Sequence, residues 1–384
     1  MKICLLGLDN LPVLAPAYRA HAIGGESVQQ TLLARALQRR GHAVSMVTAD
    51  YGQREAEVHA GIRVHKAYRP AAGVPVLRFI HPRWTGLWAA LTRADAQIYY
   101  TSCAGMQLGL LALYCARHAR RLVFRVASDA DCDPARLLIR HRRDRWLYRY
   151  GLRRADIILV QSLAQARALG RHFGRASQVA GMLVEAAQAE QPRRIDVLWV
   201  GNIRRLKRPD RLFALAAQLP QATFHMVGGP LPHEQPLYER VRLEALRHPN
   251  LTFHGRLSYW DAAGMYGRSR LLVNTSEVEG FPNAFLQAWI HGVPVVSYSD
   301  PDGLISRHGL GAAVSSPLEM REATARLLGD AAALAAAGAR CRAFMAREFG
   351  EERILAPYLA AFEELSRRAP GAAHGLAGSE AHRV

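Results

Sequence analysis

The sequence predicts an α/β protein built from two parallel-sheet domains that face each other across a cleft. Three observations predict this class. The chain has 384 residues, more than one ordinary core accommodates. Short apolar runs alternate with stretches of helical spacing, and the alternation begins again after a polar, poorly periodic segment at 184–194. Because ligands of parallel sheets bind beyond the carboxyl ends of the strands, two such halves would enclose a binding cleft.

The first half opens with strand, loop, helix and strand, which is the beginning of a parallel sheet with covering helices. The apolar run KICLLG at 2–7 predicts the first strand. A helix follows whose apolar positions share one face as far as Gly41. Further strands of this half are predicted at 43–48, 96–102, 121–128 and 155–162.

The second half repeats the alternation, with predicted helices at 209–218 and 237–247. Its strands are predicted at 195–201, 222–229, 251–255, 270–276 and 294–299. We therefore expect an N-terminal domain at 1–185, a C-terminal domain at 186–345, helices at 346–367 that pack back on the N-terminal domain, and a disordered tail at 368–384.

With 50% hydrophobic and 21% charged residues, the composition suits a water-soluble protein with a large hydrophobic core. No apolar run reaches the length of a bilayer-spanning helix, and the start MKICLLGLDN is too short and too lightly charged for a signal peptide. We therefore expect a cytoplasmic protein. The five cysteines are odd in number, scattered and never spaced as Cys-x-x-Cys, which favours neither a disulfide framework nor a zinc site: Cys4, Cys103, Cys115, Cys132 and Cys341.

The net charge of +18 and the pI of about 10.4 favour an acidic partner: nucleic acid, an anionic membrane surface or a phosphorylated substrate. Charge alone does not choose among these partners. Compositional drift is an alternative explanation, because nearly all the positive charge is arginine. The only lysines are Lys2, Lys66 and Lys207.

The segment SEVEGFPNAFLQAWIHGVPVV at 276–296 carries the clearest chemistry. It predicts a short helix that starts near Pro282 and ends at Gly292. Asn283 and Gln287 are four residues apart and therefore share a face. The free amides of the first turn and the helix dipole form an anion site suited to a diphosphate. Glu279, just before that turn, suits sugar hydroxyls instead of phosphate.

With this segment the chain resembles the retaining glycosyltransferases of the GT-B fold, family 4 (group 1), over residues 1 to about 365. The resemblance implies two facing Rossmann-like domains, with the acceptor on the N-terminal and the nucleotide sugar on the C-terminal domain. The family carries a Glu, seven residues and a second Glu. Glu279 matches the first, near the donor hexose, whereas Gln287 replaces the second, on the ribose. An amide oxygen accepts a weaker hydrogen bond than a carboxylate, so we expect weaker or altered donor binding.

The segment WVGNIRRLKRPD resembles the family's Arg, four residues, Lys pattern, whose two cations neutralise the diphosphate leaving group. Lys207 matches the lysine, but Asn202 stands where the arginine is usual. Arg204 or Arg205 is the candidate replacement. Taken without the resemblance, RRLKR is also compatible with a solvated basic loop.

The resemblance implies further donor contacts. Gly24 and Gly25 match the family's paired-glycine loop, where bare backbone approaches the donor phosphate, although Gly-Gly alone is a weak signal. The remaining candidate donor-binding residues are Gly280, Phe281, Pro282, Asn283 and Ala284 beside the phosphate, and Gly255, Arg256 and Leu257 beside the base.

Asp129 and Asp131 form an Asp-x-Asp, which in the other large glycosyltransferase fold holds a metal ion. That fold has one nucleotide-binding half, whereas this sequence predicts two, so we expect no metal. Asp129 is a candidate to orient the acceptor hydroxyl, with a helix or turn cap as the alternative role.

The segment RHRRDRWLYRYGLRR at 140–154 interleaves arginine with Trp146, Tyr148 and Tyr150. Such a helix could lie on anionic lipid, which would suit a lipid-linked acceptor. A solvated basic face is the alternative, because similar basic helices precede the strand that corresponds to 155–162 in relatives generally.

The resemblance therefore implies a metal-independent, retaining enzyme that moves a sugar from a nucleoside diphosphate, with a UDP-sugar as the expected donor and no other cofactor. The acceptor would be a hydroxyl of a glycan, a lipid-linked molecule or a small molecule. A nucleotide-sugar epimerase of similar shape and a non-catalytic partner protein are the alternatives, and Gln287 with Asn202 favours the second. No sequence motif supports nucleic-acid binding.

Overall fold

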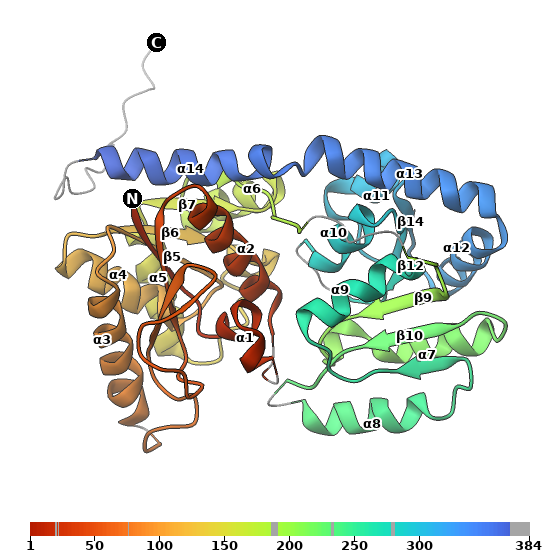
Figure 1. The fold of residues 1–384 in the computed structure, drawn as a ribbon, viewed down its shortest axis with the longest axis horizontal. Helices are drawn as coiled ribbons and strands as arrows, with labels where there is room; N and C mark the ends of the chain where they lie inside the picture. The colour runs from red at the N-terminus through yellow and green to blue at the C-terminus, as the bar shows by residue number, and fades with distance from the viewer. Residues whose placement is uncertain are drawn as a thin grey trace, which may run out of the picture.

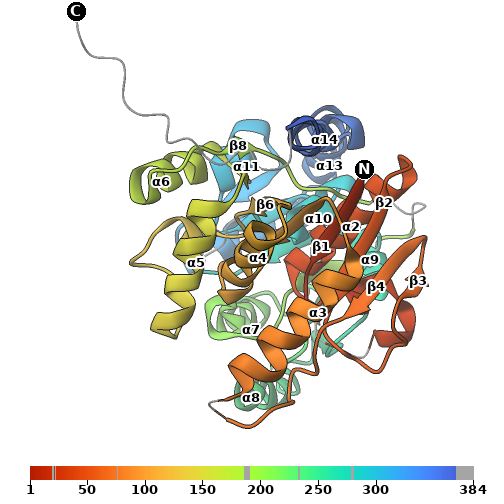
Figure 2. The same ribbon diagram turned by 90° about the vertical axis from the view of Figure 1, so that its left-hand side faces the viewer.

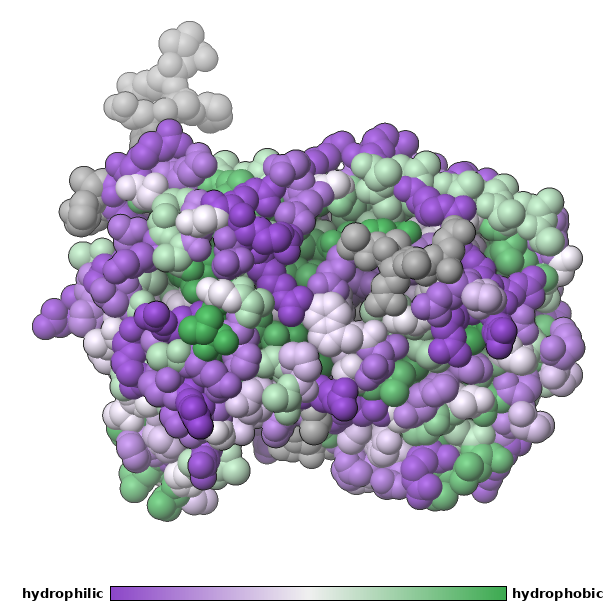
Figure 3. All heavy atoms as spheres, viewed as in Figure 1, coloured by the Kyte–Doolittle hydropathy of each residue, from purple (hydrophilic) through white to green (hydrophobic). Residues whose placement is uncertain are grey.

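The computed structural model describes residues 1–19, 21, 23–75, 77–185, 191–231, 234–277 and 281–368. Two α/β domains lie side by side, and the C-terminal helices α13 (Ala331–Glu348) and α14 (Glu351–Arg367) run along both of them (Figure 1). Figure 3, drawn in the same view as Figure 1, shows that this side of the molecule is mostly hydrophilic, with hydrophobic residues in small scattered groups. Among the described residues, no helix combines the length and the apolar composition needed to cross a bilayer.

The first domain contains a sheet in the order β3-β4-β2-β1-β5-β6-β7-β8, in which every pair is parallel except β3 with β4. The central strand β1 pairs with β2 through Ile3 and Val44, and with β5 through Ile3 and Ile98. The strands are β1 (Lys2–Leu6), β2 (Ala43–Thr48), β3 (Glu57–His59), β4 (Ile62–Lys66), β5 (Ile98–Ser102), β6 (Arg121–Arg125), β7 (Ile157–Val160) and β8 (Gln178–Val179).

Alternating side chains of this sheet enter two separate cores, as the two-residue period of a strand requires. Ile3 and Leu5 face the core that α2 and α14 cover, whereas Cys4 and Leu6 face the core under α3, α4 and α5. Figure 2 shows α5 and α6 on one flank of the domain, with β3 and β4 on the other. The helices are α1 (Leu11–Leu14), α2 (Gly25–Arg39), α3 (Thr85–Ala94), α4 (Met106–Arg117), α5 (Arg142–Arg154) and α6 (Leu163–Phe173), with the short turns η1 (Pro16–Tyr18), η2 (Leu77–Phe79), η3 (Ile80–Trp84) and η4 (Asp129–Cys132).

The second domain contains a fully parallel sheet in the order β11-β10-β9-β12-β13-β14. Its strands are β9 (Ile195–Val200), β10 (Phe224–Val227), β11 (Leu251–Phe253), β12 (Ser269–Asn274), β13 (Val295–Ser297) and β14 (Gly311–Ala313). Its helices are α7 (Pro209–Gln218), α8 (Gln235–Ala245), α9 (Tyr259–Gly267), α10 (Asn283–Ile290), α11 (Leu304–His308) and α12 (Pro317–Gly329), with the short turns η5 (Arg205–Lys207) and η6 (Pro301–Gly303).

The predicted fold class is confirmed: the chain has two α/β domains, each with an essentially parallel sheet. The sequence analysis did not anticipate β3, β4, β8 and β14. Of these, β3, β8 and β14 have only two or three residues each, whereas β4 has five and lies between β3 and β2. Helix α14 packs on the first domain through buried side chains that include Leu355, Tyr358 and Phe362. Of the tail expected to be disordered at 368–384, only Arg368 belongs to the described residues.

The strand order places a topological switch point in each sheet. In the first sheet the order reverses between β1 and β5, and in the second it reverses between β9 and β12. Ligands of open parallel sheets bind in the crevice that such a reversal opens at the carboxyl ends of the strands. The loops after Leu6, Ser102, Val200 and Asn274 are therefore the segments from which a site should be built.

A buried ion pair fixes the start of α2 to the first sheet. The Arg125 side chain, at the carboxyl end of β6, is fully buried, and its Nη1 lies 2.8 Å from Oε1 and 3.1 Å from Oε2 of Glu26. Glu26 belongs to the first turn of α2, and its side chain is 16% exposed. Since a buried charge without a partner is costly, the pair constrains where α2 begins.

We expect Arg125→Met to lower the free energy of unfolding by about 3–5 kcal/mol, because it leaves the Glu26 carboxylate without its buried partner. Adding Glu26→Gln to this variant should recover part of the loss, since the uncompensated charge is then gone. Chemical denaturation of the wild type, both single variants and the double variant measures this cycle. A double variant no more stable than Arg125→Met would contradict this account.

Candidate functional site

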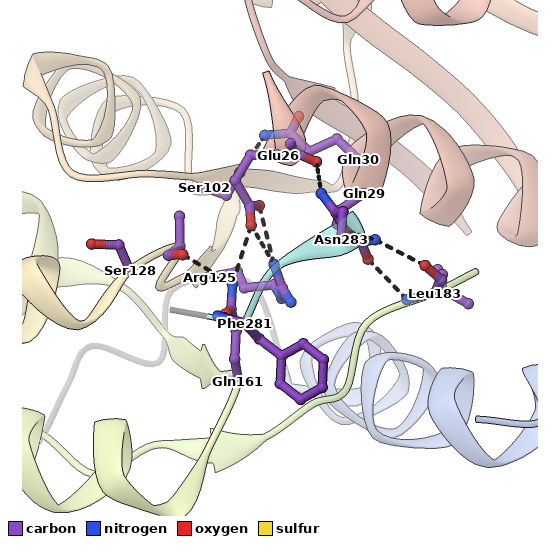
Figure 4. A network of polar contacts seen from close by, with 12 residues as sticks. Glu26, Gln29, Gln30, Ser102, Arg125, Ser128, Gln161, Leu183, Phe281 and Asn283 are labelled. Atoms are coloured by element: carbon purple, nitrogen blue, oxygen red, sulfur yellow. Dashed lines mark hydrogen bonds and ion pairs between the residues drawn. The ribbon is translucent and has the colours of Figure 1, made fainter. Parts of the chain in front are cut away.

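The starts of α2 and α10 face each other across the boundary between the domains (Figure 4). The Asn283 side chain, at the start of α10, forms two hydrogen bonds with α2. Its Nδ2 donates to the Gly25 carbonyl at 2.8 Å, and its Oδ1 accepts from Gln29 Nε2 at 2.7 Å. A Cβ atom at Gly25 would lie only 2.7 Å from Asn283 Nδ2, so glycine permits this close approach. Two helix N-termini, both able to attract anions, therefore meet at one place.

A second polar connection crosses the same boundary. The Phe281 amide donates to Gln161 Oε1 at 3.3 Å, and Gln161 Nε2 donates to Glu26 Oε1 at 3.2 Å. Glu26 in turn holds the buried Arg125. Gln161 directly follows β7, so these contacts connect the carboxyl ends of β6 and β7 to the segment that leads into α10.

Two consecutive glutamines anchor α2 to the sheet and to the chain leaving the first domain. Gln30 Nε2 donates to Ser102 Oγ at 2.6 Å, and Gln30 Oε1 accepts from Asn10 Nδ2 at 2.9 Å. Gln29 exchanges two hydrogen bonds with the backbone of Leu183, both of 2.8 Å. The start of α2 is thus held by buried polar contacts on several sides.

The predicted cationic loop follows β9 and contains the short turn η5. Thr275, which follows β12, donates from Oγ1 to the Lys207 carbonyl at 2.7 Å and accepts from Trp199 Nε1 at 2.9 Å. A Cβ atom on Gly201 would lie 3.6 Å from Cδ and Cε of Lys207, so the aliphatic stem of Lys207 packs against the end of β9. These contacts place Lys207 at the switch point of the second sheet.

The two candidate replacement arginines differ in their surroundings. Arg205 is exposed, whereas Arg204 is partly buried. Among the described residues no hydrogen-bond partner of the buried Arg204 Nε is found. Arg204 is therefore the arginine whose surroundings leave an unmet hydrogen-bonding need, which an anionic ligand would satisfy.

Asn202, where the family pattern has an arginine, also contacts the first domain. Its Nδ2 donates to the Ile23 carbonyl at 3.0 Å, which lies just before the paired glycines Gly24 and Gly25. Asn202 thereby joins the cationic loop to the start of α2. The loop, the paired glycines and the start of α10 are connected through Ile23 and Gly25, two residues apart.

Gln287 lies in α10 and is 7% exposed. Its Nε2 donates to the Tyr259 hydroxyl in the first turn of α9 at 3.0 Å. Burial raises the pKa of Tyr259, and the Glu185 carboxylate raises it further. The hydroxyl therefore stays protonated. Because Gln287 Nε2 is used by Tyr259, the amide oxygen of Gln287 is the atom of this side chain that is available to accept a hydrogen bond from a ligand.

The segment predicted to contact the base follows β11. Gly255 has a φ of +65° and its carbonyl accepts from the Gly228 amide at 2.9 Å. Arg256 Nη2 donates to the Pro230 carbonyl at 2.6 Å, and Leu257 is partly buried. These residues lie where β10 and β11 end, at the same edge of the sheet as the cationic loop.

Asp129 accepts from Gln165 Nε2 at 2.9 Å, near the start of α6. The capping role that was the alternative for Asp129 belongs to its neighbours. Ser128 caps η4 by accepting from the Ala130 amide, and Asp131 accepts from the Ala127 and Ser128 amides at 3.0 and 3.2 Å. Burial raises the pKa of Asp131 to about 6. In the described part of the chain, no group of three or more His, Cys, Asp or Glu residues is arranged to hold a metal ion.

Two predicted site residues, Glu279 and Gly280, lie outside the described residues. Pro282 is the N-cap of α10, so Asn283 and Ala284 are its first two helical residues. Most of the predicted basic segment 140–154 forms α5 (Arg142–Arg154), which buries Leu147 and Tyr148 in the core of the first domain. Trp146 is 61% exposed and stacks on Tyr150.

The sequence analysis missed five polar residues that hold the elements of the site in place. Gln29 and Gln161 form hydrogen bonds across the domain boundary. Glu26 and Arg125 pair within the first domain, and Thr275 holds the cationic loop within the second. Two of them left a signal. Arg125 is a charged residue inside an apolar strand, and Gln29 lies in the helix beside its apolar face. Such polar residues at core positions indicate buried partners.

Comparisons with known proteins agree with this architecture. The family model "Glycosyl transferase 4-like domain" matches residues 24–182, and the model "Glycosyl transferases group 1" matches residues 194–330. No curated protein matches the chain significantly.

Many solved structures resemble this chain, and three that cover nearly all of it illustrate the likeness. Sucrose-phosphate synthase from Thermosynechococcus elongatus has a TM-score of 0.76 at 20% identity, over 95% of this chain and 98% of that one. HepE from Anabaena has a TM-score of 0.72 at 18% identity, over 96% and 100% of the two chains. The catalytic domain of starch synthase IV from Arabidopsis thaliana has a TM-score of 0.65 at 13% identity, over 95% and 98%.

At these identities the structural likeness concerns the fold, whereas the family models concern the sequence itself. One model spans most of the first domain and the other most of the second. The chain belongs to the GT-B glycosyltransferases of the group 1, or family 4, type.

Proposed function

We propose that this glycosyltransferase transfers a sugar from a nucleoside diphosphate to a hydroxyl acceptor with retention of the anomeric configuration. One observation carries the proposal. The cationic loop at 204–207, the paired glycines and the start of α10 meet at the carboxyl ends of both sheets, joined by the Asn202–Ile23 and Asn283–Gly25 hydrogen bonds. Backbone amides from two helix starts and fixed cations are the groups that bind a diphosphate.

Related structures support a nucleotide donor. HepE has been solved with UDP and glucose and with UDP-glucose, and starch synthase IV with ADP and acarbose. We propose a UDP-sugar as the donor of this chain, without a metal or any other cofactor. A glycan, a lipid-linked molecule or a small molecule would supply the acceptor hydroxyl.

In the proposed reaction the bond between the anomeric carbon and the diphosphate oxygen breaks, and the acceptor oxygen bonds to that carbon on the same face. The acceptor proton passes to the departing phosphate, so the atoms balance without an enzymatic base. Lys207 and Arg204 or Arg205 stabilise the negative charge that develops on the diphosphate. The amides of Asn283 and Ala284 hold the phosphate, and Asp129 orients the acceptor.

Two further roles follow the family pattern. Glu279, outside the described residues, would bind the hexose hydroxyls. Gln287 would accept a hydrogen bond from the ribose through its amide oxygen, because its Nε2 is held by Tyr259. Peripheral contact of residues 140–154 with an anionic membrane stays a prediction that the exposed Trp146 favours, and the cytoplasmic location also stays a prediction.

Lys207→Ala should lower the rate of sugar transfer roughly a hundredfold or more, because a fixed charge aimed at the leaving group is lost. Turnover of nucleotide sugars with an acceptor panel measures this. Lys2→Ala is the matched control, since Lys2 is exposed at the amino end of β1 and pairs loosely with Asp95 at 3.9 Å. Unchanged transfer by Lys207→Ala would overturn the assignment of the cationic loop.

Gln287→Glu should bind UDP about fivefold more tightly than the wild type, because a carboxylate accepts a stronger hydrogen bond from the ribose. Calorimetric titration of UDP measures this, and Gln287→Met, which removes the acceptor, should bind more weakly than the wild type. Equal affinities for all three proteins would show that this position does not contact the ribose.

The same proteins separate the alternatives. If the wild type and Gln287→Glu both bind UDP but neither turns over any nucleotide sugar, the chain is a non-catalytic partner protein. Epimerised donor sugar formed without an acceptor would identify an epimerase instead.

A further inference from the structure

A pocket of about 240 Å³ lies on the flank of the first domain, between the C-terminal ends of α5 and α6. Four cationic or protonatable side chains line it, and apolar groups including Leu152 and Phe173 complete the wall. The four are Arg149, Arg153, His172 and Arg175. A pocket of this composition favours an anionic ligand with an apolar portion.

Half of the net positive charge of the chain lies in the segment around the pocket. Residues 134–176 contain eleven arginines and two aspartates, which gives +9, half of the net charge of +18. One of the aspartates, Asp144, already pairs with Arg143 at 2.8 Å. The positive excess at this flank is therefore not neutralised within the segment that forms it.

Helix ends account for only part of these cations. Arg175 donates to the carbonyls of Arg153 and Ala155 at 3.0 and 2.6 Å, so it satisfies the C-terminus of α5. Each helix C-terminus carries the equivalent of about half a negative charge. The ends of α5 and α6 together offset about one of the three arginine charges in the pocket.

The remaining cations point to a ligand. Among the described residues, Arg149, Arg153 and His172 form no side-chain ion pair or hydrogen bond with another residue. Burial lowers the pKa of Arg175, and the Asp156 carboxylate only partly opposes this. An anion in the pocket would stabilise the charged form of Arg175.

We propose that this pocket binds a phosphate group, supplied either by a free phosphorylated molecule or by a lipid headgroup. The guanidinium groups of Arg149 and Arg153 in the wall of this pocket match the planar, multidentate recognition that phosphate oxygens favour, and Arg175 adds positive charge beside them. The exposed Trp146 shares the face of α5 with Arg149 and Arg153, since these residues are three and seven positions apart, and it would contact the apolar part of the ligand.

The pocket is separate from the proposed donor site. Gln161 and Asp129 lie near the start of α6, at the carboxyl edge of the sheet, whereas His172 and Phe173 end the same helix. The 11 residues of α6 span roughly 16 Å. The proposal therefore does not depend on the proposed transfer reaction, and its test does not use that reaction.

The test compares two double variants with equal charge changes. Arg149→Gln with Arg153→Gln removes the pocket cations, whereas Arg167→Gln with Arg171→Gln removes two exposed arginines of α6 outside the pocket. One arm titrates inorganic phosphate at constant ionic strength, followed by phosphorus NMR. The other arm measures sedimentation with phosphatidylcholine vesicles that contain phosphatidic acid. Circular dichroism confirms that both variants are folded.

We expect the pocket variant to bind phosphate about tenfold or more weakly, and the control variant to bind as the wild type does. Selective loss in the phosphate titration identifies a free phosphate ligand, and selective loss only on vesicles identifies a lipid headgroup. Equal losses in the two variants would reveal a diffuse charge effect and overturn the proposal. Absence of wild-type binding in both arms would overturn it too.

Discussion

The parallel arrangement of the strands is the constraint on which the rest of this structure depends. In a parallel sheet every strand ends at the same edge, so each domain presents its functional loops on one side. The buried Arg125–Glu26 pair then fixes where α2 begins relative to that edge. With the start of α2 held in place, Ile23 and Gly25 can reach the second domain, and the elements of the site converge.

The contacts that join the domains at the site are neutral. Asn202, Asn283, Gln29 and Gln161 all use side-chain amides, and no charged group takes part directly in these bonds. A neutral hydrogen bond contributes only about 0.5–1.5 kcal/mol net, because water replaces it when the groups separate. Such contacts orient the two domains relative to each other at a small cost in free energy when they separate. This gives Asn202, a departure from the family pattern, a structural role.

The positive charge of the protein serves different places in different ways. Part of it lies in the loop at 204–207, where the Lys207 carbonyl accepts a hydrogen bond from the Thr275 hydroxyl. A larger part lies on α5 and α6, far along the chain from that loop. Net charge by itself is a statement about solubility and association. The net charge therefore indicates no particular ligand. The placement of the arginines in a pocket, near the exposed Trp146, is what indicates an anionic ligand.

The sequence by itself determined the fold class, the position of Lys207 at a strand end, and the helix that carries Asn283 and Gln287. These features depend on local periodicity and on the fixed geometry of parallel sheets, which a single sequence records. Only the tertiary structure decided that Arg125 pairs with Glu26, that Asn202 binds Ile23, and that Gln165 holds Asp129. Those partners are 99, 179 and 36 residues apart. Their meeting depends on the order of the strands and on how the domains face each other, and local spacing contains neither.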